Sequence, residues 1–374
     1  MKRHPAHALA FDDLVAGLTE AVGQRLVYAR RGPDGLMQYV YTSHCVFEQA
    51  WTPITIAARG LILDHAARKI VATPFPKFFN AGERDGAIPD LPFEATEKLD
   101  GSLIILFHHA GRWRTATKGA FESEQAVWAA GRLGGLDLLA LAPGTTYLAE
   151  ATYPENKIVV AHGVSAMRLL GAYTADGHEL AYADVVAVGE KLGSGSVATV
   201  SFPSLSALLT SAKGLPKTHE GYVLRFSDGM RLKVKGDEYK RIHALISGLT
   251  PLAMWEAMAK GDDLTAIRRD LPEEFWGDFD AIVGLLQNQL QARVAHVAAV
   301  AKTVEELSDK ELGLSLRKLD EVARPYIFDY RKSGGKLLEG RSRERLFRDI
   351  RPMANVLPGY VASFAVTRVM DEMG

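Results

Sequence analysis

The sequence contains one cysteine, Cys45, and has almost no net charge. A single cysteine excludes an internal disulfide and a zinc site built on several cysteines. A formal charge of −1 over 374 residues means that any contact with nucleic acid must depend on basic residues grouped locally. No apolar run has the length needed to cross a bilayer, and Asp12-Asp13 interrupt the apolar core that a secretory signal requires. We therefore expect a cytoplasmic protein without a membrane partner.

The length and a change of pattern along the chain predict two domains. Up to about residue 245, strand-like and helical runs are interleaved. From about residue 246, stretches rich in Ala, Leu, Glu and Arg with a 3.6-residue period predominate, most plainly at 273–301. We expect an α+β domain at residues 1–245 and an all-α domain at 246–374. The predicted strands are 26–30, 38–42, 60–64, 103–107, 146–149, 166–173 and 221–226, and the predicted helices between them are 11–22, 122–133 and 204–211.

Residues 97–102 read Glu-Lys-Leu-Asp-Gly-Ser and place Lys98 where a strand is expected to end. Nucleotidyltransferases use a Lys-x-Asp-Gly run of this kind to present a lysine that becomes covalently joined to a nucleotide. The string alone arises by chance in roughly one chain in ten of this length. Its companions follow in order as Arg59-Gly60, Lys77-Phe78-Phe79-Asn80, Lys118-Gly119, Glu150, Glu220-Gly221-Tyr222-Val223 and Lys233-Val234-Lys235.

Lys233 and Lys235 alternate with apolar residues, so a strand would present both ammonium groups on one face. Two cations in this position can offset negative charge on phosphoryl oxygens. Lysine is a poor nucleophile while protonated, and nearby cations favour its neutral form. We therefore expect Lys233 and Lys235 to help keep Lys98 neutral.

The segment before these lysines predicts a hairpin. If Asp228-Gly229 forms a two-residue turn, Lys235 lies opposite Tyr222, and Glu220 falls on the same face. The hairpin then offers a carboxylate for a hard cation beside the two ammonium groups.

Together these motifs resemble those of the ATP-dependent RNA ligases of the T-even bacteriophage tRNA-repair type, within the covalent nucleotidyltransferase superfamily. The resemblance extends from about Arg59 to His243. It implies a nucleotidyltransferase (ATP-grasp-like ligase) catalytic domain with antiparallel sheets, followed by a helical C-terminal domain. The segments that resemble elements of this branch are 58–64, 76–80 and 117–119 with 123–126, in addition to the lysine motif and the last two motifs.

The resemblance implies a reaction in three steps. Lys98 attacks the α-phosphorus of ATP, expels pyrophosphate and carries AMP as a phosphoramidate. AMP then passes to an RNA 5′-phosphate, and an RNA 3′-hydroxyl displaces it to form the phosphodiester. The expected partners are ATP, Mg²⁺ or Mn²⁺, and RNA with these ends, with cleaved tRNA as a candidate. We expect the protein to act as a monomer.

The same resemblance implies roles for other residues. The phosphate contacts are Arg59, Lys77, Lys118, Lys233 and Lys235, the nucleoside contact is Glu150, and the metal ligand is Glu220. Alanines flank Glu150 where the family often has aromatic residues, so Tyr41, Tyr147 and Tyr153 are the candidates for stacking on the adenine. Asp262 and Asp263 resemble a metal-binding pair of the family, although they also stand where a helix N-cap is expected.

Two other classes of protein fit less well. DNA ligases and mRNA-capping guanylyltransferases normally continue into a β-rich OB-fold, whereas the chain after Lys235 has a helical pattern. A non-catalytic RNA-binding module would be expected to have lost Lys98 or the Lys233-Val234-Lys235 motif, and this sequence keeps both. The basic stretch 331–351, with eight Lys or Arg against three Asp or Glu, fits a solvated face and an RNA-backbone contact equally.

Overall fold

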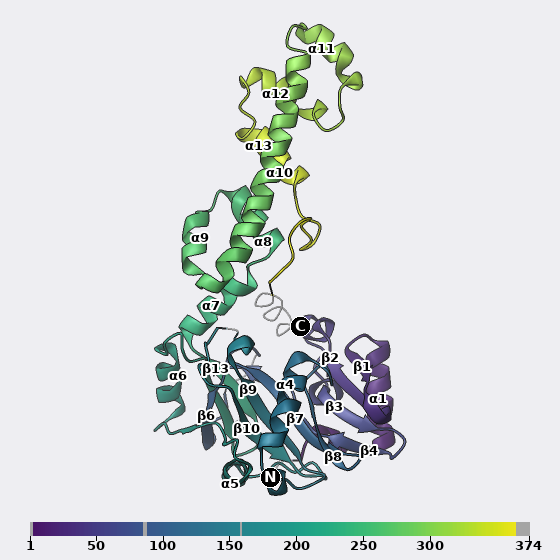
Figure 1. Ribbon diagram of the computed structural model, residues 1–374, viewed down its shortest axis with the longest axis vertical. Coiled ribbons are helices and arrows are strands. Elements are labelled where there is room, and N and C mark those ends of the chain that lie inside the picture. The colour runs from purple at the N-terminus through teal and green to yellow at the C-terminus, as the bar shows by residue number, and fades with distance from the viewer. Residues whose placement is uncertain (1–2, 85–87, 158, 364–374) are drawn as a thin grey trace. The chain divides into compact units, whose positions relative to one another are not determined.

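The computed structural model describes residues 3–84, 88–157 and 159–363. The chain forms two compact units, of which the first extends to His243 and the second begins at Ala244. The first unit combines helices with three sheets, and the second is helical (Figure 1). The predicted α+β class, with antiparallel sheets followed by a helical region, is confirmed. No helix within the described ranges has both the length and the apolar character that a membrane crossing needs.

The first sheet has the antiparallel order β1-β2-β3-β4. Leu61 and Leu63 of β3 pack with α1 and α3, whereas Ile62 points into a cluster shared with the second sheet. The elements are α1 (Phe11–Gly23), β1 (Val27–Arg31), β2 (Met37–Tyr41), α2 (Ser43–Phe47), α3 (Pro53–Ala57), β3 (Arg59–Asp64) and β4 (Lys69–Ala72).

The second sheet has the antiparallel order β10-β9-β7-β8 and is buried on both faces. Ile105 of β7 packs toward the first sheet, and Ile104 packs with α4 and α5. Every residue of β9 is buried, which places the carboxylate of Glu150 inside the protein. The elements are β7 (Ser102–His109), β8 (Arg112–Ala116), α4 (Glu124–Arg132), β9 (Thr146–Thr152), β10 (Ala166–Tyr173) and α5 (Tyr182–Leu192).

The third sheet has the order β11-β6-β12-β13-β5, antiparallel except for the β13–β5 pair. Leu208 and Ala212 of α6 cover one face by packing with Leu224. The opposite face carries Lys98 and Lys233. The elements are β5 (Phe79–Asn80), β6 (Phe93–Lys98), β11 (Thr199–Val200), α6 (Leu205–Lys213), β12 (Gly221–Phe226) and β13 (Arg231–Lys235), followed by α7 (Asp237–Ser247).

The hairpin between β12 and β13 differs by one residue from the predicted register. The amide of Phe226 donates to the carbonyl of Met230 at 2.9 Å, so the turn has three residues, 227–229, instead of two. Its last residue is a glycine with φ +85°, the conformation that commonly closes a three-residue hairpin. Lys235 therefore lies opposite Gly221 and not opposite the residue after it.

In the second unit, α8, α12 and α13 pack against α10. The indole of Trp255 in α8 donates to the carbonyl of Phe347 in α13 at 2.8 Å. The elements are α8 (Pro251–Lys260), α9 (Leu264–Asp270), α10 (Trp276–Thr303), α11 (Asp309–Ser315), α12 (Ile327–Lys332) and α13 (Gly340–Asp349).

Candidate active site

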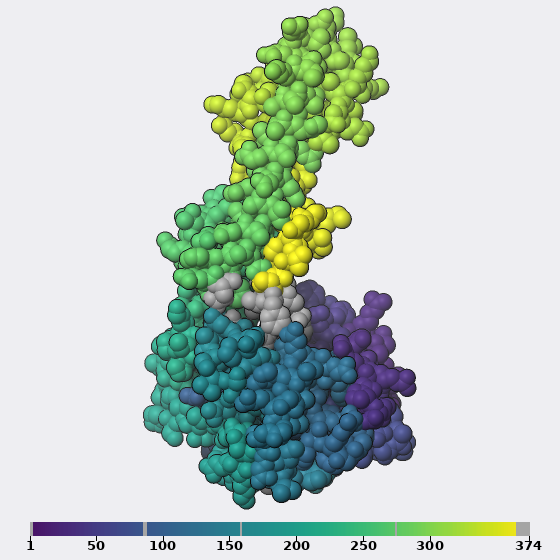
Figure 2. All heavy atoms as spheres, viewed as in Figure 1, coloured from purple at the N-terminus to yellow at the C-terminus, as the bar shows by residue number. Residues whose placement is uncertain are grey.

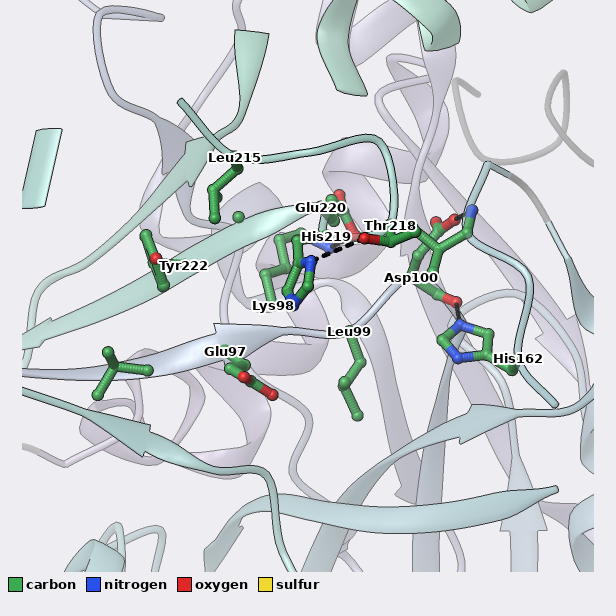
Figure 3. Close-up of a pocket in the computed structure, with 13 residues that line it drawn as sticks. Glu97, Lys98, Leu99, Asp100, His162, Leu215, Thr218, His219, Glu220 and Tyr222 are labelled. Atoms are coloured by element: carbon green, nitrogen blue, oxygen red, sulfur yellow. Dashed lines mark hydrogen bonds and ion pairs between the residues drawn. The ribbon is translucent and has the colours of Figure 1, made fainter. Parts of the chain in front are cut away.

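A buried carboxylate joins two of the predicted lysines. Lys98 at the end of β6 and Lys235 at the end of β13 both lie opposite Gly221, one on each side of β12. The Glu220 side chain accepts a hydrogen bond from Lys98 Nζ through Oε2 at 2.7 Å, and its Oε1 lies 3.1 Å from Lys235 Nζ. Figure 3 shows Glu220 beside Lys98. Glu220 is 3% exposed, so the two charge pairs are strong.

Gly221 makes this arrangement possible. Regular alternation would direct Glu220 to the face opposite to Lys98 and Lys235, because both lysines share the face of residue 221. Gly221 has φ +151°, a conformation that residues with side chains rarely adopt, and a Cβ here would collide with the carbonyl oxygen of Val234. The glycine thus redirects the chain so that the carboxylate fits between the two ammonium groups.

Asp100 fixes the loop that follows Lys98. Its Oδ2 accepts hydrogen bonds from the amides of Val159 and Val160 at 2.8 and 2.6 Å, and its Oδ1 accepts one from the Tyr239 hydroxyl at 2.8 Å. Asp100 is 2% exposed, and a buried carboxylate with three donors holds its surroundings firmly. The sequence analysis did not select Asp100, although it stands in the Lys-x-Asp-Gly motif.

The sequence analysis did not identify two further residues of the site, Asn156 and Tyr239. The Ser102 hydroxyl donates to Asn156 Oδ1 at 3.1 Å, and the Asn156 amide donates to the Ala151 carbonyl at 2.6 Å, which ties the lysine motif to β9. The ring of Tyr239 lies 5.1 Å from Lys235 Nζ. These contacts connect β7 with β9, and β13 with α7.

Electrostatics reverse one expectation. Burial alone lowers the pKa of Lys98, but the carboxylates of Glu220 and Glu150 outweigh it and hold the pKa above its ordinary value. The expectation that neighbouring lysines keep Lys98 neutral is wrong for this arrangement, because a carboxylate at 2.7 Å acts more strongly than they do. Burial raises the pKa of Glu150 to about 7, although Lys98 opposes the shift.

Lys233 is the lysine whose pKa falls. Burial lowers the pKa of Lys233 well below its ordinary value, and Arg59 and Lys98 add to the shift. The Phe78 ring lies 4.9 Å from Lys233 Nζ and 5.4 Å from the Arg59 guanidinium carbon. Among the described residues, Nη1 of Arg59 has no hydrogen-bond partner although it is buried. Crowded, desolvated cations of this kind suit a phosphate group.

Lys77 and Lys118 complete the group of predicted phosphate contacts. Their Nζ atoms lie 6.0 and 5.2 Å from the centroid of the Tyr41 ring. Burial raises the pKa of Tyr41, but Arg59, Lys118 and Lys77 outweigh it and lower the pKa. The structure therefore places Tyr41, which we selected as an adenine contact, among the phosphate-binding candidates. Of the other adenine candidates, Tyr147 is buried in the core and Tyr153 stacks on Trp128 at 4.3 Å.

The paired aspartates lie in the second unit. Asp263 caps α9, because its Oδ1 accepts hydrogen bonds from the amides of Thr265 and Ala266 at 3.0 and 3.1 Å. The described ranges contain no cluster of three or more His, Cys, Asp or Glu side chains that could hold a metal. Metal binding by Asp262 and Asp263 stays a prediction, and a cation at Glu220 would need further oxygen ligands from a substrate or water.

A pocket of about 180 Å³ borders the lysine motif (Figure 3). Tyr222 and Glu97 lie opposite each other in the sheet, next to the Lys98–Gly221 pair, so they face away from the Lys98 ammonium group. The pocket is also lined by Lys98, Asp100 and Glu220, so it reaches the lysine motif itself. Its lining includes Glu97, Leu99, His162, Leu215, His219 and Tyr222.

Replacing Glu220 by Gln should make Lys98 more reactive. The change removes the charge that does most to raise the pKa of Lys98, so Lys98 should react with an amine-directed acylating reagent at a pH lower by about one unit or more. Peptide mass spectrometry across a pH series measures this. Glu97→Gln, on the other face of the sheet, is the control. An unchanged pH profile in Glu220→Gln would mean that the ion pair does not control Lys98.

Replacing Glu150 by Gln should remove a pH-dependent loss of stability. The pKa of about 7 lies above the ordinary value of 4.5, so the folded protein holds a proton that the unfolded chain releases, and stability falls as pH rises through this interval. Relative to the unaltered protein, Glu150→Gln should gain about 1–3 kcal/mol between pH 5 and 7.5. Urea unfolding at both values tests this, with the exposed Glu122→Gln as control. An equal difference at both pH values would refute the assignment.

Comparison with known proteins agrees with this geometry. Residues 57–239 match the model of a family described as RNA ligase. An RNA ligase of Rhodothermus phage RM378 is 26% identical over 117 residues, which cover 25% of this chain and 26% of that protein. A protein of Autographa californica nuclear polyhedrosis virus, provisionally named a bifunctional polynucleotide kinase/RNA ligase, is 32% identical over 83 residues, which cover 19% of this chain and 12% of that protein. The chain thus spans about a quarter or less of these curated relatives.

Solved structures resemble the chain more remotely. An archaeal ATP-dependent RNA ligase is 15% identical with a TM-score of 0.48, and the match covers 98% of each chain. The matched family segment contains Lys98, Glu150, Glu220 and Lys233 but neither Tyr41 nor the paired aspartates. Residues 57–239, just under half of the chain, are thus similar to the RNA ligase family.

Proposed function

We propose that this protein is an ATP-dependent RNA ligase that works through a lysyl-AMP on Lys98. The observation that carries the proposal is the bridge from Lys98 through Glu220 to Lys235, inside the segment that matches the RNA ligase family. The bridge holds the nucleophile beside a face that also carries Lys233 and, from other elements, Arg59. A nucleophilic amine next to grouped cations is the arrangement that attack on a triphosphate requires.

In the first step the neutral Nζ of Lys98 attacks the α-phosphorus of ATP. A P–N bond forms, the bond to the β-phosphate oxygen breaks, and pyrophosphate leaves. Lys98 must first lose a proton, since Glu220 stabilises its ammonium form. Glu220 is also the residue that would hold Mg²⁺ or Mn²⁺, a hard cation that carboxylate oxygen suits. When bound, the metal supplies positive charge beside the phosphoryl oxygens.

The remaining cations divide between the α-phosphate and the leaving group. Lys233 and Lys235 share the face of Lys98, so they are suited to the α-phosphate. Lys233 has a lowered pKa, so an arriving phosphate favours proton uptake there. Arg59 and Lys77 come from the first sheet and the segment before β5, and together with Lys118 they suit the departing pyrophosphate.

The two later steps use the same residues. An oxygen of the RNA 5′-phosphate attacks the phosphorus of lysyl-AMP, the P–N bond breaks, and the Lys98 nitrogen takes up a proton. The RNA 3′-hydroxyl then attacks the activated 5′-phosphate, loses its proton, and AMP leaves. Glu150, buried and with a pKa near neutrality, is the proposed nucleoside contact. The bound RNA is a chain with these two ends, and cleaved tRNA is the candidate we propose.

We propose a division of labour between residues 1–245 and 246–374. The phosphate, nucleoside and nucleophile candidates from Tyr41 to Lys235 all lie in the first unit, so the helical unit is proposed to select the RNA. A monomer in the cytoplasm fits this scheme, since a ligase with all its nucleotide contacts in one chain needs no second copy.

The basic stretch 331–351 contains both structural and exposed arginines. Arg343 donates to the carbonyls of Met258 and Ala259 at 2.8 and 2.7 Å, which satisfies the end of α8. Arg341 and Arg348 are exposed on α13, and Figure 2 shows residues of this stretch at the surface of the helical unit. We propose that these two arginines contact the RNA backbone, whereas Arg343 supports the helix packing.

Joining of RNA ends tests the function directly. An oligoribonucleotide with a 5′-phosphate and a 3′-hydroxyl should be joined in the presence of ATP with Mg²⁺ or Mn²⁺, and EDTA should stop the reaction. Lys98→Ala should abolish joining while leaving the melting temperature within a few degrees. Denaturing electrophoresis measures the product. Joining by Lys98→Ala, or joining that needs GTP in place of ATP, would contradict the proposal.

Reversing exposed charges on α13 should weaken RNA joining. The double change Arg341→Glu and Arg348→Glu should raise KM for RNA and reduce the slope of log affinity against log salt by up to about 2. Self-labelling with ATP should change little, because it needs no RNA. Arg343→Ala is the contrast, since losing two hydrogen bonds should cost about 1–3 kcal/mol of stability. Equal loss of joining and self-labelling in the double variant would mean that these arginines also support the fold.

A further inference from the structure

We propose that Trp51 is a positioning residue for Lys77. Together with Tyr41 and Phe79, Trp51 forms an aromatic cage that holds the Lys77 ammonium group in place for the phosphates of a polyphosphate ligand. The inference rests on the proposed function only in naming ATP and its leaving pyrophosphate as that ligand. None of the sequence motifs includes Trp51.

Three rings surround the Lys77 ammonium group. Its Nζ lies 4.8 Å from the ring centroid of Phe79, 5.2 Å from that of Trp51 and 6.0 Å from that of Tyr41. The indole of Trp51 meets both neighbours edge to face, at 5.2 Å from Tyr41 and 5.4 Å from Phe79. Trp51 is thus the ring that joins the other two, and each ring is within the distance at which a cation is attracted.

The chain around α3 fixes the cage. The Trp51 indole donates to the Gln49 side chain at 3.2 Å, and the Trp51 amide donates to the Gln49 carbonyl at 2.8 Å. The Lys77 amide donates to the carbonyl of Ile56, within α3, at 2.8 Å. The indole therefore sits directly before α3, and the Lys77 backbone is attached to α3. Both partners of the cation–ring contact thus lie at or next to the same short helix.

A cage of rings has an advantage over a close ion pair at this position. The Lys77 side chain is 10% exposed, and Lys77 contributes to the positive field that lowers the pKa of Lys233. The faces of aromatic rings carry negative potential and stabilise a desolvated cation. They do this without neutralising it, so the charge stays available for phosphate. Lys98 and Lys235, by contrast, share the carboxylate of Glu220 at 2.7 and 3.1 Å.

One carboxylate, that of Glu83, approaches Lys77, but the contact is too long to be a strong ion pair. Oε1 of Glu83 lies 3.4 Å from Lys77 Nζ, which is longer than a strong charge-assisted contact. Oε2 of Glu83 instead accepts hydrogen bonds from the amide and the side chain of Asn80 at 2.7 and 2.6 Å. Glu83 is thus held mainly by the strand β5. Lys77 therefore has one long carboxylate contact, to Glu83, in addition to the three rings.

A double-mutant cycle on the full chain tests this. The variants are Trp51→Leu, Lys77→Met and their combination, and the probe is inorganic pyrophosphate, with binding measured by titration calorimetry. Trp51→Leu should weaken pyrophosphate binding about tenfold, and Lys77→Met tenfold or more. The combined variant should bind no more weakly than Lys77→Met alone, because the ring acts through the lysine. Additive losses, or unchanged binding in Trp51→Leu, would overturn the proposal.

A second measurement avoids any failure of Trp51→Leu to fold. Site-specific replacement of Trp51 by tryptophans carrying increasing numbers of fluorine atoms keeps the shape of the indole while weakening its negative face. Pyrophosphate affinity should fall stepwise with fluorination if the ring holds the cation. Constant affinity would show that Trp51 only fills space. Because pyrophosphate binding needs no ligation, a protein that fails to join RNA but passes this test refutes the proposed function and leaves the cage intact.

Discussion

The bridge that Glu220 forms between Lys98 and Lys235 is the interaction on which the rest of the site depends. Lys98 and Lys235 lie on the two strands that flank β12, on either side of Gly221, and their ammonium groups repel each other in a partly buried place. Glu220 removes that repulsion with one carboxylate, and Gly221 alone allows the carboxylate to reach the space between them. Asp100 then fixes the loop after Lys98, so that the nucleophile and its partner keep one geometry.

The first unit holds its cations in two physically different ways. Carboxylates hold Lys98 and Lys235, which stabilises their charged forms. Aromatic rings hold Lys77, which stabilises a cation without neutralising it. Lys233 also lies against a ring, but burial and neighbouring cations lower its pKa. The difference matches the proposed tasks, since the nucleophile must be released from its partner before it reacts, while a phosphate contact must present its charge from the start.

The sequence predicted the elements that depend on local pattern. The strand bounds 166–173 and 221–226 agree with β10 and β12, and the apolar run 103–107 belongs to a strand buried on both faces. The β5 and β11 strands were missed because two residues give no periodicity. The predicted hairpin register was wrong by one residue because a three-residue turn with a terminal glycine has nearly the same sequence signal as a two-residue turn.

The motifs also identified most of the candidate site. The errors of the sequence-based prediction share one cause. Asp100 was passed over because its partners, among them Val160 and Tyr239, are distant in the sequence. The direction of the pKa shift of Lys98 was wrong because a distance of 2.7 Å to Glu220 cannot be read from the order of residues. Trp51 could not be identified from the sequence because its proposed role depends on contacts with Tyr41, Lys77 and Phe79, which only the fold brings together. Residues that act through their spacing in the sequence could be predicted, whereas residues that act through contacts between distant segments could not.

The most direct test of the account is the position of the nucleotide on the protein. After incubation with ATP and Mg²⁺ but without RNA, the chain is denatured, digested, and analysed by peptide mass spectrometry. The account predicts a peptide that carries one AMP group in phosphoramidate linkage on Lys98, and acid should release the AMP. AMP attached to another lysine, or the absence of an adduct under conditions in which the protein joins RNA, would contradict it.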